Sequence, residues 1–125
     1  RRALAADATD AEASNQLGLL LARRGASEEA RRLFQQAISA RRDHAGAINN
    51  LGVLYLQLNQ RNDAIAAFQY GLEAAPESDI LYVNLAKIFA QGGDREKAKQ
   101  VMHRLLERDP ENGTARKMLR ELESQ

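Results

Sequence analysis

The chain has 125 residues, a length that allows one domain with a sizeable core. Its formal charge of +1, from 18 basic and 17 acidic residues, gives no overall field that would attract nucleic acid. It contains no cysteine, which excludes disulfides, thiol catalysis and cysteine-ligated zinc, and no run of about 18 apolar residues that could span a membrane.

The first ten residues look like the end of a unit rather than a complete one. Ala3 and Leu4 precede Ala37 and Ile38 by 34 residues, the period found in the rest of the chain. We therefore expect residues 1–10 to be the tail of a preceding repeat. The chain does not begin with methionine, and we interpret it as a piece of a longer protein whose array extends upstream.

From residue 11 onward the sequence repeats every 34 residues, and this repeat predicts the fold. The units cover residues 11–44, 45–78 and 79–112, and residues 113–125 follow them. Each unit has a leucine, a small residue directly after it, a large residue four positions after the leucine, and later an alanine followed by another large residue. These positions are Leu17, Leu51 and Leu85; Gly18, Gly52 and Ala86; Leu21, Tyr55 and Phe89; Ala30, Ala64 and Ala98; and Phe34, Phe68 and Met102.

Each unit is predicted to form two antiparallel helices, because its apolar residues recur at helical spacing on either side of a polar turn. Gly25 and Gly93 mark two of these turns, and Ser27 and Asp94 are predicted to cap the helices that follow. The last segment alternates leucines with charged residues, as a capping helix does. The predicted helices cover 11–24, 27–42, 45–58, 62–75, 79–91, 95–108 and 113–123.

Glycine in a helix costs about 1 kcal/mol relative to alanine, so Gly18 and Gly52 require an explanation. Close approach of two helices explains both glycines. We expect Phe34 to pack over the backbone at Gly18, and Phe68 to pack over the backbone at Gly52.

The pattern resembles the tetratricopeptide repeat. In the second unit the resemblance is carried by Leu51-Gly52, Tyr55, Ala64, Phe68 and Pro76. The tryptophan that is usual early in this repeat is replaced in the three units by Ser14, Ile48 and Tyr82. The resemblance implies an all-α fold, a right-handed superhelical array of antiparallel helix pairs with a C-terminal capping helix. It also implies a protein-binding scaffold.

The residues needed for an enzyme or a metal site are missing. The only histidines, His44 and His103, are 59 positions apart without a paired carboxylate, and we expect both to be solvated surface residues. No glycine-rich phosphate loop is present, and the serines have no candidate base nearby. We therefore expect neither catalysis nor a cofactor.

One row of polar residues indicates a binding surface. The residue before each leucine of the first helices is a carboxamide: Gln16, Asn50 and Asn84. Asn15 and Asn49 flank this row, and Leu19, Val53 and Lys87 follow it three positions later. The row resembles the asparagine ladder with which some members of the family hold an extended peptide. The alternative is that these side chains only solvate a helix face.

A second binding device of the family, a basic clamp for acidic chaperone C-termini, is mostly absent. Its places along the first helices are occupied by Asn15, Ile80 and Asn84, and only Asn50 matches. Docking to a chaperone through such a clamp is therefore not expected.

Three functions follow from these observations. The first is binding of a partner protein or extended peptide on the concave face, through the carboxamide row. The second is a structural role, self-assembly within a larger multi-repeat protein, because Leu17, Leu20 and Leu21 would form an apolar N-terminal edge through which homo-oligomers could form. The third, RNA binding, is disfavoured because acidic residues offset most of the charge of the arginine doublets. Neither the partner nor the compartment follows from the sequence, since cytosol and periplasm both tolerate cysteine-free proteins.

Overall fold

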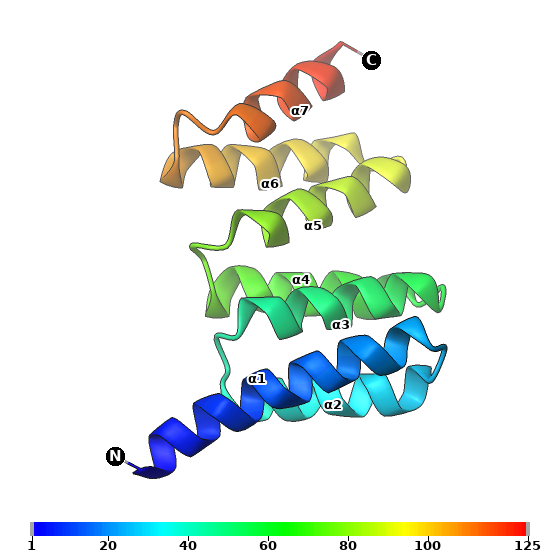
Figure 1. Cartoon of the computed structure of the whole chain (residues 1–125). Coiled ribbons are helices and arrows are strands. Elements are labelled where there is room, and N and C mark those ends of the chain that lie inside the picture. The colour runs from blue at the N-terminus through cyan, green and yellow to red at the C-terminus, as the bar shows by residue number, and fades with distance from the viewer. Residues whose placement is uncertain (1, 125) are drawn as a thin grey trace. The chain divides into compact units, whose positions relative to one another are not determined.

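The structure is a computed structural model that describes the backbone of residues 2–124 and the side chains of residues 10–124. This part of the chain contains seven α-helices and no strand, which confirms the all-α repeat fold (Figure 1). The helices are α1 (Arg2–Arg23), α2 (Ser27–Ala40), α3 (Ala45–Gln57), α4 (Arg61–Ala74), α5 (Asp79–Gln91), α6 (Arg95–Arg108) and α7 (Gly113–Glu123).

The chain divides into two compact units between Ala75 and Pro76. In the first unit α1 packs on α2, α2 on α3, and α3 on α4, and α1 also touches α3. In the second unit α5 packs on α6, and α7 contacts both of them. No helix in the described residues is both long and apolar enough to cross a membrane.

The predicted start of the first helix is wrong. The sequence predicted a helix from residue 11, whereas α1 begins at Arg2 and continues without a break to Arg23. The physical reason is composition: four of residues 3–8 are alanine, the best helix former, and neither glycine nor proline occurs before Gly18. The assignment of residues 1–10 to a preceding repeat stays a prediction, and the side chains of Ala3 and Leu4 lie outside the described residues.

The turns within the helix pairs occupy the same place in each repeat. Gly25, Asn59 and Gly93 all have positive φ, of 83°, 62° and 84°, where glycine and asparagine are tolerated best. Asp94 caps α6 as predicted, because its carboxylate accepts a hydrogen bond from the amide of Lys97 at 3.2 Å. Ser27 does not cap α2: it is the first helical residue, and the N-cap position is occupied by Ala26.

The two helical glycines lie where aromatic rings cross the neighbouring helix. A Cβ atom added at Gly18 would lie 2.8 Å from Cε1 of Phe34, and one added at Gly52 would lie 2.6 Å from Cε2 of Phe68. Phe34 and Phe68 are 1% and 0% exposed. The prediction that glycine allows these rings to pack over the helix backbone is confirmed.

Candidate functional site

A hollow of about 190 Å³ lies between α1 and α3 and contains part of the predicted binding surface. Its apolar lining includes the side chains of Phe34 and Leu54, which are 1% and 2% exposed. The other lining residues are Leu19, Ala22 and Arg23 of α1 and Asn50, Val53 and Gln57 of α3. Three residues predicted to bind a peptide, Leu19, Asn50 and Val53, therefore line one depression that has both apolar and polar side chains in its wall.

The side chain of Asn50 is held in place by Asn15 of the neighbouring first helix. Nδ2 of Asn50 donates a hydrogen bond to Oδ1 of Asn15 at 2.9 Å, and Asn15 is only 5% exposed. This bond uses one of the two N–H groups of Asn50 and leaves its second N–H and its carbonyl oxygen. Asn15 was predicted to flank the binding row, but its burial makes it a support for Asn50.

Gln16 belongs to a second polar group on α1, centred on Glu12. Nε2 of Gln16 donates to Oε2 of Glu12 at 3.4 Å, and Gln16 itself is exposed. The hydrogen bond from His44, first, and the one from Gln16 hold the pKa of Glu12 below its usual value, because they favour the charged carboxylate. Glu12 therefore adds a negative charge next to the first carboxamide of the row.

The prediction that His44 is a solvated surface residue is wrong. His44 is 8% exposed and is the N-cap of α3, because Nδ1 of its ring accepts a hydrogen bond from the amide of Ala47 at 3.1 Å. An accepting Nδ1 places the ring proton on Nε2, which then donates to Oε1 of Glu12 at 2.9 Å. His44 thus joins the start of α3 to α1, while His103 is exposed as expected.

The remaining predicted residues lie beside this hollow or in the other unit. Asn49 is half-buried on α3. Asn84, half-buried, and Lys87, exposed, lie three residues apart on α5 in the second unit. Within the first unit, the structure therefore brings together Asn15, Leu19, Asn50 and Val53.

Two family models described as Tetratricopeptide repeat match the sequence, one over residues 55–122 and the other over residues 11–47. No curated protein matches the sequence.

Solved structures with a similar fold come from several proteins. The first tetratricopeptide repeat domain of Spaghetti (RPAP3), bound to the HSP90 peptide SRMEEVD, has a TM-score of 0.76 and 19% identity, over 94% of this chain and 95% of that one. The first such domain of human RPAP3 has a TM-score of 0.73 and 19% identity, over 92% and 91% of the two chains. The protein MamA has a TM-score of 0.72 and 24% identity, over 86% of this chain and 59% of MamA. These likenesses concern the fold, and the family matches cover most of the sequence. The chain belongs to the tetratricopeptide repeat family.

Proposed function

We propose that the chain is a protein-interaction scaffold that binds an extended segment of a partner protein along its first helices. Proteins of this family are generally non-catalytic scaffolds. The observation that carries the proposal is the hollow between α1 and α3, where the carboxamide of Asn50 stands beside the apolar side chains of Leu19 and Val53. The residues proposed to contact the segment are Gln16, Leu19, Asn49, Asn50, Val53, Asn84 and Lys87, with Asn15 as the support of Asn50.

The chemistry of the carboxamides suits a peptide backbone. A carboxamide offers two donors and one acceptor, so it can bond to both groups of a peptide unit. Packed helices stand about 8–10 Å apart and an extended chain advances about 3.3 Å per residue, so about three residues of the segment match one repeat. The segment would thus be held largely by its backbone, and the hollow would accept one of its apolar side chains.

Replacement of Asn50 by alanine should weaken binding of such a segment about ten- to a hundredfold. The reason is that a buried peptide group that loses its partner costs about 1–3 kcal/mol. The segment would first be identified by screening the whole chain against an array of overlapping peptides. Titration calorimetry with the strongest binder would then compare the wild-type chain with Asn50→Ala and Asn50→Asp.

Arg32→Ala is the control for this experiment, because Arg32 is exposed on α2, away from the hollow. Its loss should change the affinity by less than about twofold, as is usual for exposed charges. The carboxamide row would be ruled out by a peptide whose affinity is unchanged by Asn50→Ala and by Asn84→Ala but is lowered by Arg32→Ala.

A second function, self-assembly, is favoured by the exposed leucines of α1. Leu51 and Leu85 are 7% and 1% exposed, whereas Leu17, at the same place of the first repeat, is 48% exposed. Leu20, one helical turn further, is 43% exposed. In the second repeat, Leu51 packs against Ala30 and Phe34 of the preceding α2, and no described helix precedes α1 to cover Leu17 in the same way.

We expect this surface to drive association of two copies of the chain. Sedimentation equilibrium should show concentration-dependent self-association of the wild type. The double variant Leu17→Ser/Leu20→Ser should weaken it at least about tenfold, since each leucine removes apolar area from water in both partners. Leu58→Ser, which changes a leucine that is 36% exposed on another part of the first unit, is the control and should have no effect. A wild type that stays monomeric at millimolar concentration would contradict self-assembly.

A further inference from the structure

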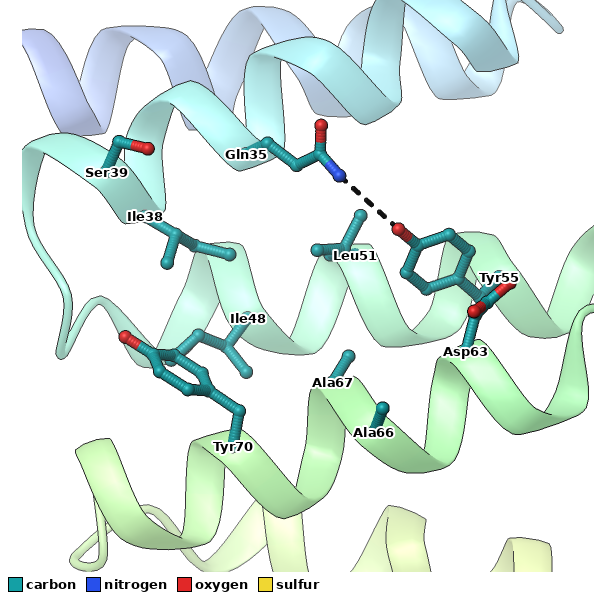
Figure 2. Close-up of a pocket in the computed structure, with 10 residues that line it drawn as sticks. All are labelled: Gln35, Ile38, Ser39, Ile48, Leu51, Tyr55, Asp63, Ala66, Ala67 and Tyr70. Atoms are coloured by element: carbon teal, nitrogen blue, oxygen red, sulfur yellow. Dashed lines mark hydrogen bonds between the residues drawn. The ribbon is translucent and has the colours of Figure 1, made fainter.

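A second and larger hollow lies on a different side of α3 and has no part in the binding described above. Its volume is about 400 Å³, within the range of ligand-binding pockets, and it shares no lining residue with the hollow between α1 and α3 (Figure 2). This larger hollow, called the groove from here on, lies between α2 and α4, and both helices pack on α3. Its lining residues are Gln35, Ile38, Ser39, Ile48, Leu51, Tyr55, Asp63, Ala66, Ala67 and Tyr70.

The wall of the groove on α4 includes a pair of small residues that occurs only in the second repeat. Ala66 and Ala67 of α4 correspond, 34 residues earlier, to Arg32 and Leu33 of α2. In the third repeat the same two places hold Gln100 and Val101, so only the second repeat has two alanines there. Because the periodic core residues around them are retained, this pair of small residues leaves space at the surface without loss of the fold.

The two ends of the groove differ in character. Figure 2 shows Tyr70 at one end and Asp63 with Tyr55 at the other. The hydroxyl of Tyr70 donates to the backbone oxygen of Arg42 at 2.9 Å, which fixes the ring as a wall. At the other end Nε2 of Gln35 donates to the hydroxyl of Tyr55 at 3.4 Å. Asp63 and Tyr70 are seven residues apart on α4, about 10 Å along its axis.

The end with Asp63 carries a negative charge that the described residues do not neutralise. No hydrogen bond or ion pair joins the Asp63 carboxylate to another described residue. The cation bonded to Gln35 is Arg31, and its charge is offset by an ion pair with Glu28 at 2.6 Å. An apolar groove with an unneutralised carboxylate at one end is complementary to an apolar group that carries a cation next to it.

We propose that this groove binds a segment of a partner protein that inserts one large apolar side chain and places a lysine or arginine against Asp63. The apolar side chain lies over Ile38, Ala66 and Ala67, which are half-buried or exposed in the free chain, and removes their exposed surface from water. The cation lies between the Asp63 carboxylate and the Tyr55 hydroxyl. This site is separate from the carboxamide row, so the scaffold can hold two segments at once.

The test uses the whole chain and two small probes, acetyl-Leu-Arg-amide and acetyl-Leu-Glu-amide, titrated to millimolar concentration with two-dimensional amide NMR. The Leu-Arg probe should shift amide signals around the groove residues of α2, α3 and α4 in a saturable way. The Leu-Glu probe, which has the same apolar group and the opposite charge, should bind at least about threefold more weakly, as expected for one partly exposed ion pair.

Three variants locate the interaction. Asp63→Asn should lower the affinity for the Leu-Arg probe about three- to fivefold and should not lower the affinity for the Leu-Glu probe. Glu29→Gln is its matched control, because Glu29 has the same place in α2 that Asp63 has in α4 but does not line the groove. Ala67→Leu introduces the residue of the first repeat and should close the groove, abolishing saturable binding of both probes, while thermal unfolding by circular dichroism verifies that the variant is folded.

The result expected is therefore binding that depends on Asp63 and on space at Ala67, with Glu29→Gln behaving as wild type. The proposal is overturned if neither probe causes saturable shifts at the groove, or if both bind equally. It is also overturned if Asp63→Asn and Glu29→Gln have the same effect on the affinity for the Leu-Arg probe. The same holds if the folded Ala67→Leu variant binds the probes as tightly as the wild type does.

Discussion

Replacement of Phe68 by alanine should lower the free energy of unfolding by about 3–5 kcal/mol, the cost of truncating a large buried side chain. The ring of Phe68 is 0% exposed and lies against the backbone of α3 at Gly52, where it joins α3 to α4. Domains of ordinary size are stable by about 5–15 kcal/mol, so this single change removes a large part of the total. Urea unfolding followed by circular dichroism measures the loss.

Tyr70→Ala is the comparison for Phe68→Ala, because it removes an aromatic ring from the same helix. Tyr70 is 41% exposed and makes one hydrogen bond, to the backbone oxygen of Arg42. Its loss should cost only about 1 kcal/mol. If Phe68→Ala costs less than 1 kcal/mol, or no more than Tyr70→Ala, then Phe68 is not a core residue and the 34-residue register is wrong.

The register was predictable because close helix contacts restrict residue size. Gly52 must be small and Phe68 must be large for the same reason, which is that one packs on the other. Such restrictions recur in every repeat and are therefore visible as periodic spacing in a single sequence. The helix ends predicted from the turns also agree with the structure to within two residues, apart from the start of α1.

Burial of individual polar residues could not be predicted in this way. Asn15 is buried against Asn50, 35 residues away, and His44 contacts Glu12, 32 residues away. Both contacts join side chains that are far apart in the sequence, and repeat spacing shows which positions are alike in successive repeats, not which side chains meet. His44 also lies in a polar turn, where a solvated side chain is the ordinary expectation.

The groove between α2 and α4 corresponds to a difference between the repeats and not to a residue that they share. Alignment of the repeats shows Ala66-Ala67 where the first repeat has Arg32-Leu33. Positions at which one repeat departs from the others indicate local features of the surface. The positions that hold similar residues in all three repeats, in contrast, indicate the packing that the repeats share.

Replacement of Gly52 by valine should destabilise the chain by about 3 kcal/mol, near the upper end of the cost of overpacking. A Cβ atom at this position would approach three carbon atoms of the Phe68 ring within 2.9 Å. The ring is 0% exposed and protein interiors are close-packed, so the ring or the helices must shift to admit the new side chain. Urea unfolding again measures the change.

Gly113→Ala is the control for Gly52→Val, since a Cβ atom at Gly113, the first residue of α7, would meet nothing within 4 Å. It should leave stability unchanged or raise it by up to about 1 kcal/mol, as replacement of an unconstrained glycine does.

The sharper test of the contact between Gly52 and Phe68 combines changes at both residues. In the Phe68→Ala background the ring is gone, so Gly52→Ala meets no obstacle there and should stabilise α3 by up to about 1 kcal/mol through the higher helix propensity of alanine. In the wild-type background the same Gly52→Ala change should instead destabilise, because the clash outweighs that gain. The two residues should therefore show a coupling energy of about 1–3 kcal/mol in a double-mutant cycle. If Gly52→Ala has the same effect in both backgrounds, the glycine is not required by the aromatic ring, and the physical explanation for the small residue in this repeat fails.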